Sequence, residues 1–276
     1  MSVADNIFIQ NCRDILSRGF KDDGYPVRTV WADGKTAYSF KKFGVVNRYA
    51  LWEEFPIITL RRTFFKSAID ELLWIWQKKS NRVSELNSKI WDSWTDENGT
   101  IGKAYGYQLG VKYDFPEGRF DQVDKILFDL KYNPMSRRIL ASMYNFTDLK
   151  EMKLYPCAYS LTLNVNGGRL NAILNQRSQD MLVANNWNVC QYAVLVHMLA
   201  QISGFAPGEL VHVIADAHIY DRHIPIVEKI IGNPIFSAPK FLMDKSVADF
   251  YAFNTDSFGL ENYRYTELNE KIPVAI

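Results

Sequence analysis

The feature that most constrains the fold is the segment NVCQYAVLVHMLAQISGF, residues 188 to 205, because it is apolar on nearly every side of a helix. A helix at a protein surface needs only one apolar stripe, whereas a helix that is apolar all round must be enclosed by other elements. Gly204 then supplies the residue type that commonly ends a helix. The segment predicts a helix buried in the middle of a large core.

The composition allows such a core. The chain has 276 residues, of which 47% are hydrophobic, and this suits one large domain or two small ones. No repeat, low-complexity tract or Gly/Ser-rich linker divides the chain. We therefore expect a single domain over residues 1–276.

Two further segments carry an apolar stripe at helical spacing. FKSAIDELLWIWQKKS, residues 65 to 80, predicts an amphipathic helix whose closing lysines favour a helix C-terminus through its dipole. DQVDKILFDLKYNP, residues 121 to 134, predicts a second amphipathic helix that Pro134 ends.

Strand signals lie between these helices. SLTLNVNGGRLNAIL, residues 160 to 174, alternates apolar and polar residues on both sides of Asn166-Gly167 and predicts a hairpin that turns there. A second β-rich piece, LVHVIADA at 210 to 217, runs into His218-Ile219-Tyr220. Helices that alternate irregularly with antiparallel strands predict an α+β fold.

Charge and cysteine content exclude several classes of function. With 32 Lys+Arg against 31 Asp+Glu, the chain lacks the broad basic face that duplex nucleic acid requires, so we expect no nucleic-acid partner. We also expect no membrane partner and a cytoplasmic location, since no signal peptide or long apolar run stands out. Cys12, Cys157 and Cys190 are too few for a disulfide scaffold and lack metal-ligand spacing, so no metal is expected.

Cys157 and Arg177 stand at the two open ends of the predicted hairpin. A hairpin brings its open ends together, so the two residues are expected to be neighbours. A nearby guanidinium can lower a thiol pKa from about 8.5 into the range where thiolate is available at neutral pH. A lone cysteine beside a strand is more often a small buried hydrophobe, and the pattern by itself leaves both interpretations open.

The chain resembles the folate-dependent thymidylate synthase family. Between residues 156 and 220 the matching motifs are Pro156-Cys157, Gln176-Arg177-Ser178 with Asp180, Trp187-Asn188, and Asp216-Ala217-His218-Ile219-Tyr220. Upstream they are VRT (27 to 29), DELLW (70 to 74), IWDSWTDENGTIGKAYGYQLG (90 to 110) and NPMSRR (133 to 138), and the chain ends in PVAI. Motifs in the same order over nearly the whole chain are far more specific than any one motif. The resemblance implies a single catalytic α+β domain with a twisted, mainly antiparallel sheet packed by helices.

The resemblance also implies a reaction: reductive methylation of dUMP at C5 by 5,10-methylenetetrahydrofolate, giving dTMP and dihydrofolate. Uracil C5 is a poor nucleophile, so a thiolate must first add to C6, and Cys157 is the expected thiol. Glu71 is expected to move protons, because burial on its apolar helix would raise its pKa. Tyr105 resembles the family tyrosine that organises a water beside the C5 proton, although a core tyrosine is an equal alternative.

The resemblance assigns residues to both ends of the nucleotide. Planar arginines hold a phosphate best, and Asn188 can pair with uracil N3 and O4, which favours dUMP over dCMP. His218 and Tyr220, which follow the β-rich piece at 210 to 217, resemble the residues that bond the deoxyribose 3′-hydroxyl. The expected substrate-binding residues are Arg28, Arg137, Arg138, Gln176, Arg177, Ser178, Asn188, His218 and Tyr220.

For the folate, Asp180 resembles the carboxylate that faces the pterin, and Trp91 and Trp94 offer flat aromatic faces. Arg61 is expected near the folate tail, and Ile276 ends the segment that closes over the site. The family's adjacent arginine pair comes from the other subunit. The resemblance therefore implies an obligate homodimer in which Arg137 and Arg138 act across the interface, with one sheet face as the dimer surface.

Some positions depart from the family pattern. Arg61 replaces a lysine, Ala158 a histidine and Ala215 a glycine, while VANNWN at 183 to 188 replaces Leu-Gly-x-Pro-Phe-Asn through residues such as Ala184 and Asn186. A looser folate pocket would admit water, so a dUMP 5-hydroxymethylase that releases tetrahydrofolate is an alternative. A non-catalytic nucleotide-binding homologue is another. Trp91 and the PVAI tail are retained and should exclude water, which argues against the hydroxymethylase. The intact Cys157 and Glu71 argue against the non-catalytic homologue.

Overall fold

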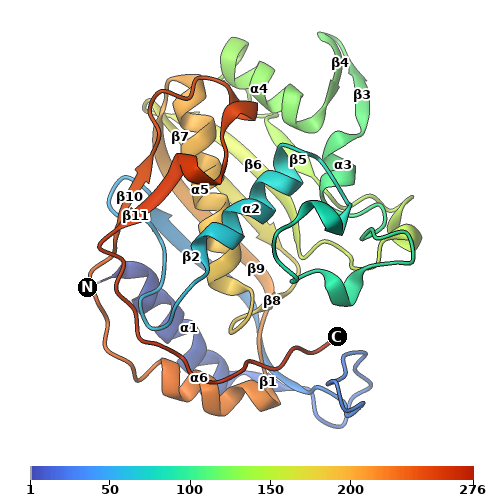
Figure 1. The fold of residues 1–276 in the computed structure, drawn as a ribbon, viewed down its shortest axis with the longest axis vertical. Helices are drawn as coiled ribbons and strands as arrows, with labels where there is room; N and C mark the ends of the chain where they lie inside the picture. The colour runs from blue at the N-terminus through green and yellow to red at the C-terminus, as the bar shows by residue number, and fades with distance from the viewer. Residues whose placement is uncertain (1) are drawn as a thin grey trace.

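The all-apolar segment forms α5, Asn185–Ser203, which lies against the main sheet in the computed structural model of residues 2–276 (Figure 1). Nearly every side chain of its middle turns is buried, and Gly204 caps it with a φ of 74°. The left-handed conformation costs glycine little, because it has no Cβ. The predicted central helix is confirmed.

The main sheet has seven strands in the order β1-β2-β9-β7-β6-β5, and β8 pairs with β9 off this path. Its strands are β1 (Phe20–Lys21), β2 (Ser39–Ala50), β5 (Leu140–Ser142), β6 (Ala158–Asn166), β7 (Arg169–Gln176), β8 (Gln179–Asp180) and β9 (Ala206–Tyr220). β9 runs parallel to β7 and β8, and the other neighbours are antiparallel. The predicted α+β class with a mainly antiparallel sheet is confirmed.

The predicted hairpin is β6–β7, but its turn lies one residue later than expected. Asn166 pairs with Arg169, so the two turn residues are Gly167 and Gly168, with φ values of 57° and 74°. A tight turn with positive φ at both central residues accepts Gly-Gly as well as Asn-Gly, so the turn residues alone leave the register open by one position.

The helices pack mainly around α5 and one face of the sheet. They are α1 (Val3–Arg18), α2 (Phe65–Trp76), α3 (Gly106–Gly110), α4 (Gln122–Tyr132) and α6 (Ile224–Ile230). α4 begins at its cap Asp121 as the sequence predicts. α2 ends before the predicted lysines, because Lys79 has a φ of 51° and its Nζ bonds Asp121 Oδ2 at 2.7 Å. A tertiary ion pair therefore turns the chain where the sequence predicts one more helical turn.

Smaller elements complete the fold. Two hairpins, β3 (Lys112–Phe115) with β4 (Gly118–Asp121) and β10 (Lys240–Met243) with β11 (Phe258–Glu261), form separate sheets. Short 3₁₀ turns occur at Val83–Glu85, Asp92–Trp94, Leu149–Glu151, Asp221–His223, Phe250–Ala252 and Thr255–Ser257. Within residues 2–276, no helix has both the length and the apolar character needed to cross a membrane.

The strands of the main sheet also carry apolar side chains that no helix covers. Phe43 and Val46 of β2 are 88% and 54% exposed, and Ile173 of β7 is 42% exposed. Most large apolar residues of these strands, such as Leu161, Leu174 and Ile214, are instead fully buried beneath the helices.

Candidate active site

The predicted site residues meet because several strands end at the same edge of the sheet. β7, β8 and β9 are parallel, so their carboxyl ends coincide, and β6 begins where its antiparallel neighbour β7 ends. Cys157 directly precedes β6, Arg177 directly follows β7, and Asp180 lies in β8. His218 and Tyr220 close β9 at the same edge.

Cys157 and Arg177 are neighbours, as the hairpin argument predicts. The Arg177 backbone N–H donates to the Cys157 carbonyl at 3.0 Å, and Arg177 Nη2 lies 3.9 Å from Cys157 Sγ. The same guanidinium donates to the carbonyls of Pro156, at 3.1 Å, and Tyr155, at 2.6 Å. These bonds hold the positive charge beside the sulfur.

The pKa of Cys157 nevertheless lies above its ordinary value. Burial raises the pKa of the thiol, and the charges of Arg177 and Arg28 and the bond to Tyr105 only partly offset that rise. The guanidinium acts in the expected direction, but burial outweighs it in the unliganded chain. The sequence shows the charge but not the depth of the pocket, which decides the balance.

Glu71 is the buried carboxylate of the site. It is 5% exposed, and burial raises its pKa, as predicted. Trp91 Nε1 donates to Oε1 at 2.6 Å, while Gln191 Nε2, at 2.7 Å, and Trp187 Nε1 both donate to Oε2. These N–H donors favour the ionised form and oppose part of the effect of burial.

The sequence does not predict that Trp187 and Gln191 bond Glu71. They stand four residues apart on α5, so they project from the same face of that helix. This spacing is readable from the sequence, but it shows neither that this face meets α2 nor that Glu71 is opposite. To predict these contacts, one must know which face of α5 packs against α2.

Tyr105 links the thiol to the aromatic wall. Its hydroxyl accepts the Cys157 backbone N–H at 2.9 Å, and its ring meets Trp91 edge-on with centroids 5.3 Å apart. Its φ of 46° and ψ of −106° are rare for a residue with a side chain, and such strain concentrates at functional sites. Burial raises the pKa of Tyr105 well above its ordinary value, so the hydroxyl keeps its proton.

A narrow cavity of about 50 Å³ lies among these groups. Its polar lining comes from Glu71, Tyr105, Asn188 and Gln191. A water molecule needs on the order of 10–15 Å³ of such space and several polar partners, so the cavity suits a few waters but not a nucleotide.

Asn188 is oriented by neighbouring amides. Gln176 Nε2 donates to Asn188 Oδ1 at 3.4 Å, and Asn188 Nδ2 donates to Gln191 Oε1 at 3.2 Å. Gln176 is itself held by His212, whose Nε2 lies 2.5 Å from Gln176 Oε1. Burial lowers the pKa of His212 to about 3, so the ring is neutral and its Nε2–H donates to Gln176. The amide of Asn188 is therefore fixed before any ligand arrives.

His218 and Tyr220 lie at the end of β9. His218 Nδ1 is 2.8 Å from Asp216 Oδ1, and its ring meets Tyr220 edge-on with centroids 4.9 Å apart. The Asp216 carboxylate accepts from Nδ1–H and fixes the orientation of the ring.

Asp180 joins the site to the C-terminal segment. The backbone N–H groups of Leu182 and Val183 donate to its Oδ1 at 2.9 and 3.0 Å, and His223 Nδ1 lies 3.7 Å from the same oxygen. Burial acts to raise the pKa of Asp180, but His223 and these N–H groups outweigh it and hold the pKa below its ordinary value. His223 Nε2 lies 2.7 Å from the Pro273 carbonyl.

The other residues expected near folate differ in exposure. Trp91 is 7% exposed and meets the partly buried Trp94 edge-on at 5.8 Å. Arg61 is only 9% exposed and donates to the Leu182 carbonyl at 2.5 Å, so it braces the segment after β8 rather than reaching outward. Ile276 pairs with Val30 through two backbone hydrogen bonds of 2.9 Å.

The remaining phosphate candidates are not assembled in one chain. Arg28, Arg137 and Arg138 are exposed, and within residues 2–276 their guanidinium groups bond no acceptor. Ser178 is partly buried next to Arg177. The sequence pattern finds these residues, and the structure gathers only part of the set around Cys157.

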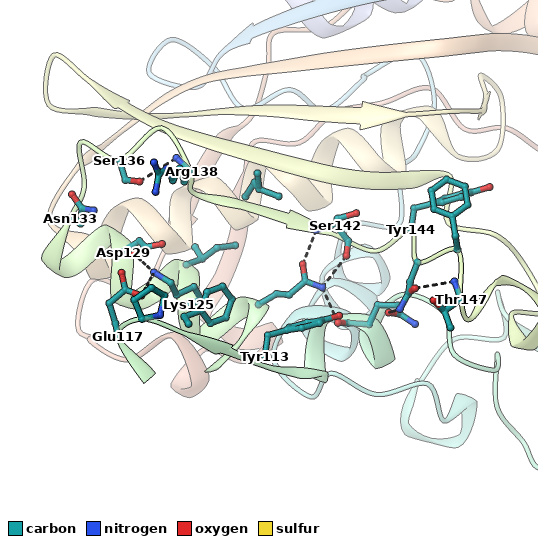
Figure 2. A pocket seen from close by; sticks show the side chains of 18 residues that line it. Tyr113, Glu117, Lys125, Asp129, Asn133, Ser136, Arg138, Ser142, Tyr144 and Thr147 are labelled. Carbon is teal, nitrogen blue, oxygen red and sulfur yellow. Dashed lines mark hydrogen bonds and ion pairs between the residues drawn. The ribbon is translucent and has the colours of Figure 1, made fainter. Parts of the chain in front are cut away.

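A groove of about 910 Å³ is much larger than the cavity at Glu71, but it is lined by different residues (Figure 2). It lies between α4, the β3–β4 hairpin and β5, with Ser136 and Arg138 toward one end and Tyr144 and Thr147 toward the other. Its lining includes none of Cys157, Glu71 and Tyr105. The smaller cavity is lined by Glu71 and by Tyr105, whose hydroxyl bonds the Cys157 backbone, so it is the candidate reaction centre.

Comparisons with known proteins give consistent matches over nearly the whole chain. A family model described as thymidylate synthase matches residues 6–276. The chain is 42% identical to thymidylate synthase of Bacillus phage phi3T and 41% identical to that of Bacillus subtilis subsp. natto, each over 270 residues and 96% of both chains. A solved structure of thermostable thymidylate synthase A from Bacillus subtilis matches with a TM-score of 0.93 at 40% identity, covering 99% of both chains.

Proposed function

Since the chain belongs to the thymidylate synthase family, we propose that it forms dTMP and dihydrofolate from dUMP and 5,10-methylenetetrahydrofolate, with Cys157 as the nucleophile. The observation that carries this proposal is the arrangement of Cys157 between Arg177 and Tyr105, beside the Glu71 cavity. A thiol held next to a fixed positive charge and a proton-transfer group is what conjugate addition to a uracil ring requires.

In the proposed mechanism, Cys157 adds to uracil C6 and makes C5 nucleophilic. The folate supplies the one-carbon unit and later the hydride that turns it into a methyl group. Before that hydride transfer, the C5 proton is lost and the bond between the one-carbon unit and the folate nitrogen breaks, while the tetrahydrofolate stays bound. After it, elimination of the Cys157 sulfur frees the product. Arg177 stabilises the thiolate at the start and at the end of this sequence, because its charge is fixed beside Sγ.

Glu71 and Tyr105 are proposed to move protons during these steps. Burial raises the pKa of Glu71 above the ordinary glutamate value, which makes its carboxyl group a better proton carrier than an exposed carboxylate. The cavity between Glu71, Tyr105 and Asn188 has room for a few waters that extend this exchange to the substrate.

Asn188 is proposed to read the base, and the β9 residues to read the sugar. A side-chain amide offers one donor and one acceptor, which matches O4 and N3–H of uracil. Gln176 supports this assignment because it orients the Asn188 amide. His218 and Tyr220 are placed at the same sheet edge to bond the 3′-hydroxyl.

For the folate, Asp180 is proposed to accept from the pterin, with Trp91 and Trp94 forming one wall. The low pKa of Asp180 keeps its carboxylate ionised and therefore an acceptor. Ile276 lies beside the segment that carries Arg28, where the C-terminal tail is able to cover both ligands. The buried position of Arg61 makes it a support for the Asp180 segment rather than a direct contact to the folate tail.

We also propose a homodimer in which the partner supplies Arg137 and Arg138. The exposed apolar side chains of the main sheet, including Phe43 and Val46, support a protein–protein contact there. Arg138 lies near one end of the groove in Figure 2, exposed and without an acceptor in its own chain within residues 2–276. Together with Arg28, Arg177 and Ser178, this pair would complete a phosphate site.

A cytoplasmic location is proposed on chemical grounds. Cys12, Cys157 and Cys190 are free, and the proposed nucleophile must stay reduced to work. The cytosol keeps thiols reduced, whereas oxidising compartments do not.

A turnover assay with dUMP and methylenetetrahydrofolate, with both products identified by mass spectrometry, tests the function. Methylated nucleotide and dihydrofolate are expected. Hydroxymethylated nucleotide with tetrahydrofolate would overturn the methyl-transfer step in favour of the hydroxymethylase, and no turnover together with tight dUMP binding would indicate a non-catalytic homologue. The hydrogen bonds from both indoles to Glu71 favour the first result, because they close the pocket on that side.

A further inference from the structure

The two oxygens of Glu71 have unequal hydrogen bonding. Oε2 accepts from Trp187 Nε1 and from Gln191 Nε2, whereas Oε1 accepts from Trp91 Nε1 alone. An ionised carboxylate has about two acceptor positions on each oxygen. Within residues 2–276, Oε2 is therefore fully used by side-chain donors, and Oε1 retains one position.

The geometry points to Trp187 and Gln191 as positioning residues: we propose that they clamp Glu71 Oε2, so that Oε1 is the atom that exchanges protons in the reaction. This inference rests on the proposed function, because it refines the role of Glu71 in it. It also predicts that Trp187, in the segment that departs most from the family pattern, contributes its N–H and not only its bulk.

Gln191 extends the clamp to the base-reading group. Its Nε2 also donates to the Ala68 carbonyl of α2 at 3.1 Å, and its Oε1 accepts from Asn188 Nδ2 at 3.2 Å. The amide is thus fixed at both ends, with the nitrogen on Glu71 and the oxygen on Asn188. One side chain therefore sets the acid and the uracil contact relative to each other.

The surroundings make the effect of the clamp measurable. The titratable groups that face Glu71 are Asp70 on its own helix and the buried hydroxyls of Tyr105 and Tyr192. Burial raises the pKa of both tyrosines above their ordinary value, so neither titrates near neutral pH. Glu71 and Asp70 are thus the carboxyl groups to be told apart in the titration, and the Glu71→Gln variant does so.

The test compares Trp187→Phe with Trp74→Phe. Phenylalanine keeps an aromatic ring and removes the N–H. Trp74 is a matched control, because its Nε1 donates to the Arg82 carbonyl at 3.0 Å and leaves the Glu71 carboxylate alone. The carboxyl carbons of isotopically labelled glutamate are titrated by NMR in each intact enzyme, with Glu71→Gln identifying the resonance.

We expect the pKa of Glu71 to rise by about one unit in Trp187→Phe, since a hydrogen bond to the ionised form is lost. We expect kcat to fall about tenfold at neutral pH, with the KM for dUMP within about twofold of wild type. An unshifted titration, or an equal shift in Trp74→Phe, overturns the clamp. A shifted pKa with unchanged kcat overturns its role in the reaction.

Gln191→Met serves as a second variant, in case Trp187→Phe does not fold. It removes the other donor to Oε2 and must raise the same pKa; an unchanged pKa contradicts the clamp. Wild-type turnover separates this inference from the proposed function. If the wild type makes no dTMP while the titration still shifts, the function fails and the hydrogen-bond arrangement stands.

Discussion

The two ends of the proposed nucleotide site are built in opposite ways. Around Cys157 and Glu71, most polar groups already have partners: Tyr105 bonds the Cys157 backbone, and indole and amide N–H groups bond both oxygens of the Glu71 carboxylate. At the phosphate end, Arg28 and Arg137 are exposed and bond no acceptor within residues 2–276. Bond-making chemistry needs a fixed geometry, whereas a dianion is captured well by flexible charged groups that close on it.

In the proposed homodimer, the contrast also separates what one chain would supply from what two chains would supply. The reacting groups come from α2, α5 and the strand ends of one sheet, and their positions depend on a shared core. The arginine pair lies on the loop between α4 and β5, next to the groove in Figure 2. A defect at the first end should therefore abolish chemistry, and a defect at the second should weaken binding.

The largest effect is expected from Cys157→Ser. The alkoxide is far less accessible than the thiolate, so turnover should fall to background, a loss of more than about 10⁴-fold. Calorimetric titration should show dUMP affinity close to that of the wild type, because Arg177 and Asn188 remain. Retained turnover would remove Cys157 from the nucleophile role.

Replacing the arginine pair should have the next largest effect. Arg137→Ala with Arg138→Ala should raise the KM for dUMP by roughly 10³-fold with a smaller change in kcat, since charge-assisted bonds to phosphate are lost. Arg119→Ala, an exposed arginine of the β3–β4 hairpin, is the matched control.

Mixed dimers make this comparison sharper. One subunit carrying Cys157→Ser and one carrying the double arginine change should regain activity, because one of the two shared sites keeps its own cysteine and receives intact arginines. If the mixture stays inactive while each parent dimer is folded, the arginines do not act across an interface.

Asn188→Asp should change the choice of base by about 10²-fold toward dCMP. A carboxylate can accept from the cytosine amino group, but it cannot donate to uracil O4. Competition between dUMP and dCMP in one reaction gives this ratio directly. An unchanged ratio would show that Asn188 does not read the base.

The smallest effect is expected from pH. Burial raises the pKa of Cys157, so the thiolate fraction at pH 7 is small and grows about tenfold per unit as the pH rises toward that pKa. Covalent capture of 5-fluoro-dUMP with the folate should accelerate accordingly between pH 7 and 8. Arg177→Gln should slow capture and move its profile to higher pH; an identical profile would mean that the guanidinium does not stabilise the thiolate.

The sequence predicts those parts of the molecule that depend on local pattern. Helix α5, the β6–β7 hairpin and the Cys157–Arg177 contact follow from periodicity and turn residues, and the family motifs point to Glu71. These signals lie within short stretches of chain. The order of the strands cannot be predicted from such short stretches. The parallel pairing of β7 with β9 is what brings the distant motifs together.

Other features depend on how distant segments meet. The bonds from Trp187 and Gln191 to Glu71 depend on which face of α5 packs against α2. The early end of α2 depends on Lys79 reaching Asp121, and the net pKa of Cys157 on burial that no local pattern reveals. None of these is visible until the fold fixes distances between segments.

Helix α5 has one more consequence, which concerns folding. It is the connection between the parallel strands β7 and β9, apart from the short β8, and Asn188 lies in its first turn. Parallel neighbours need a crossover connection between them, and α5 is the main part of this one. We therefore expect the centre of the sheet and the end of the pocket that holds Asn188 to form together, in a slow, non-local step. A partly folded chain lacks both, so the capacity to bind nucleotide should appear only when the whole core does.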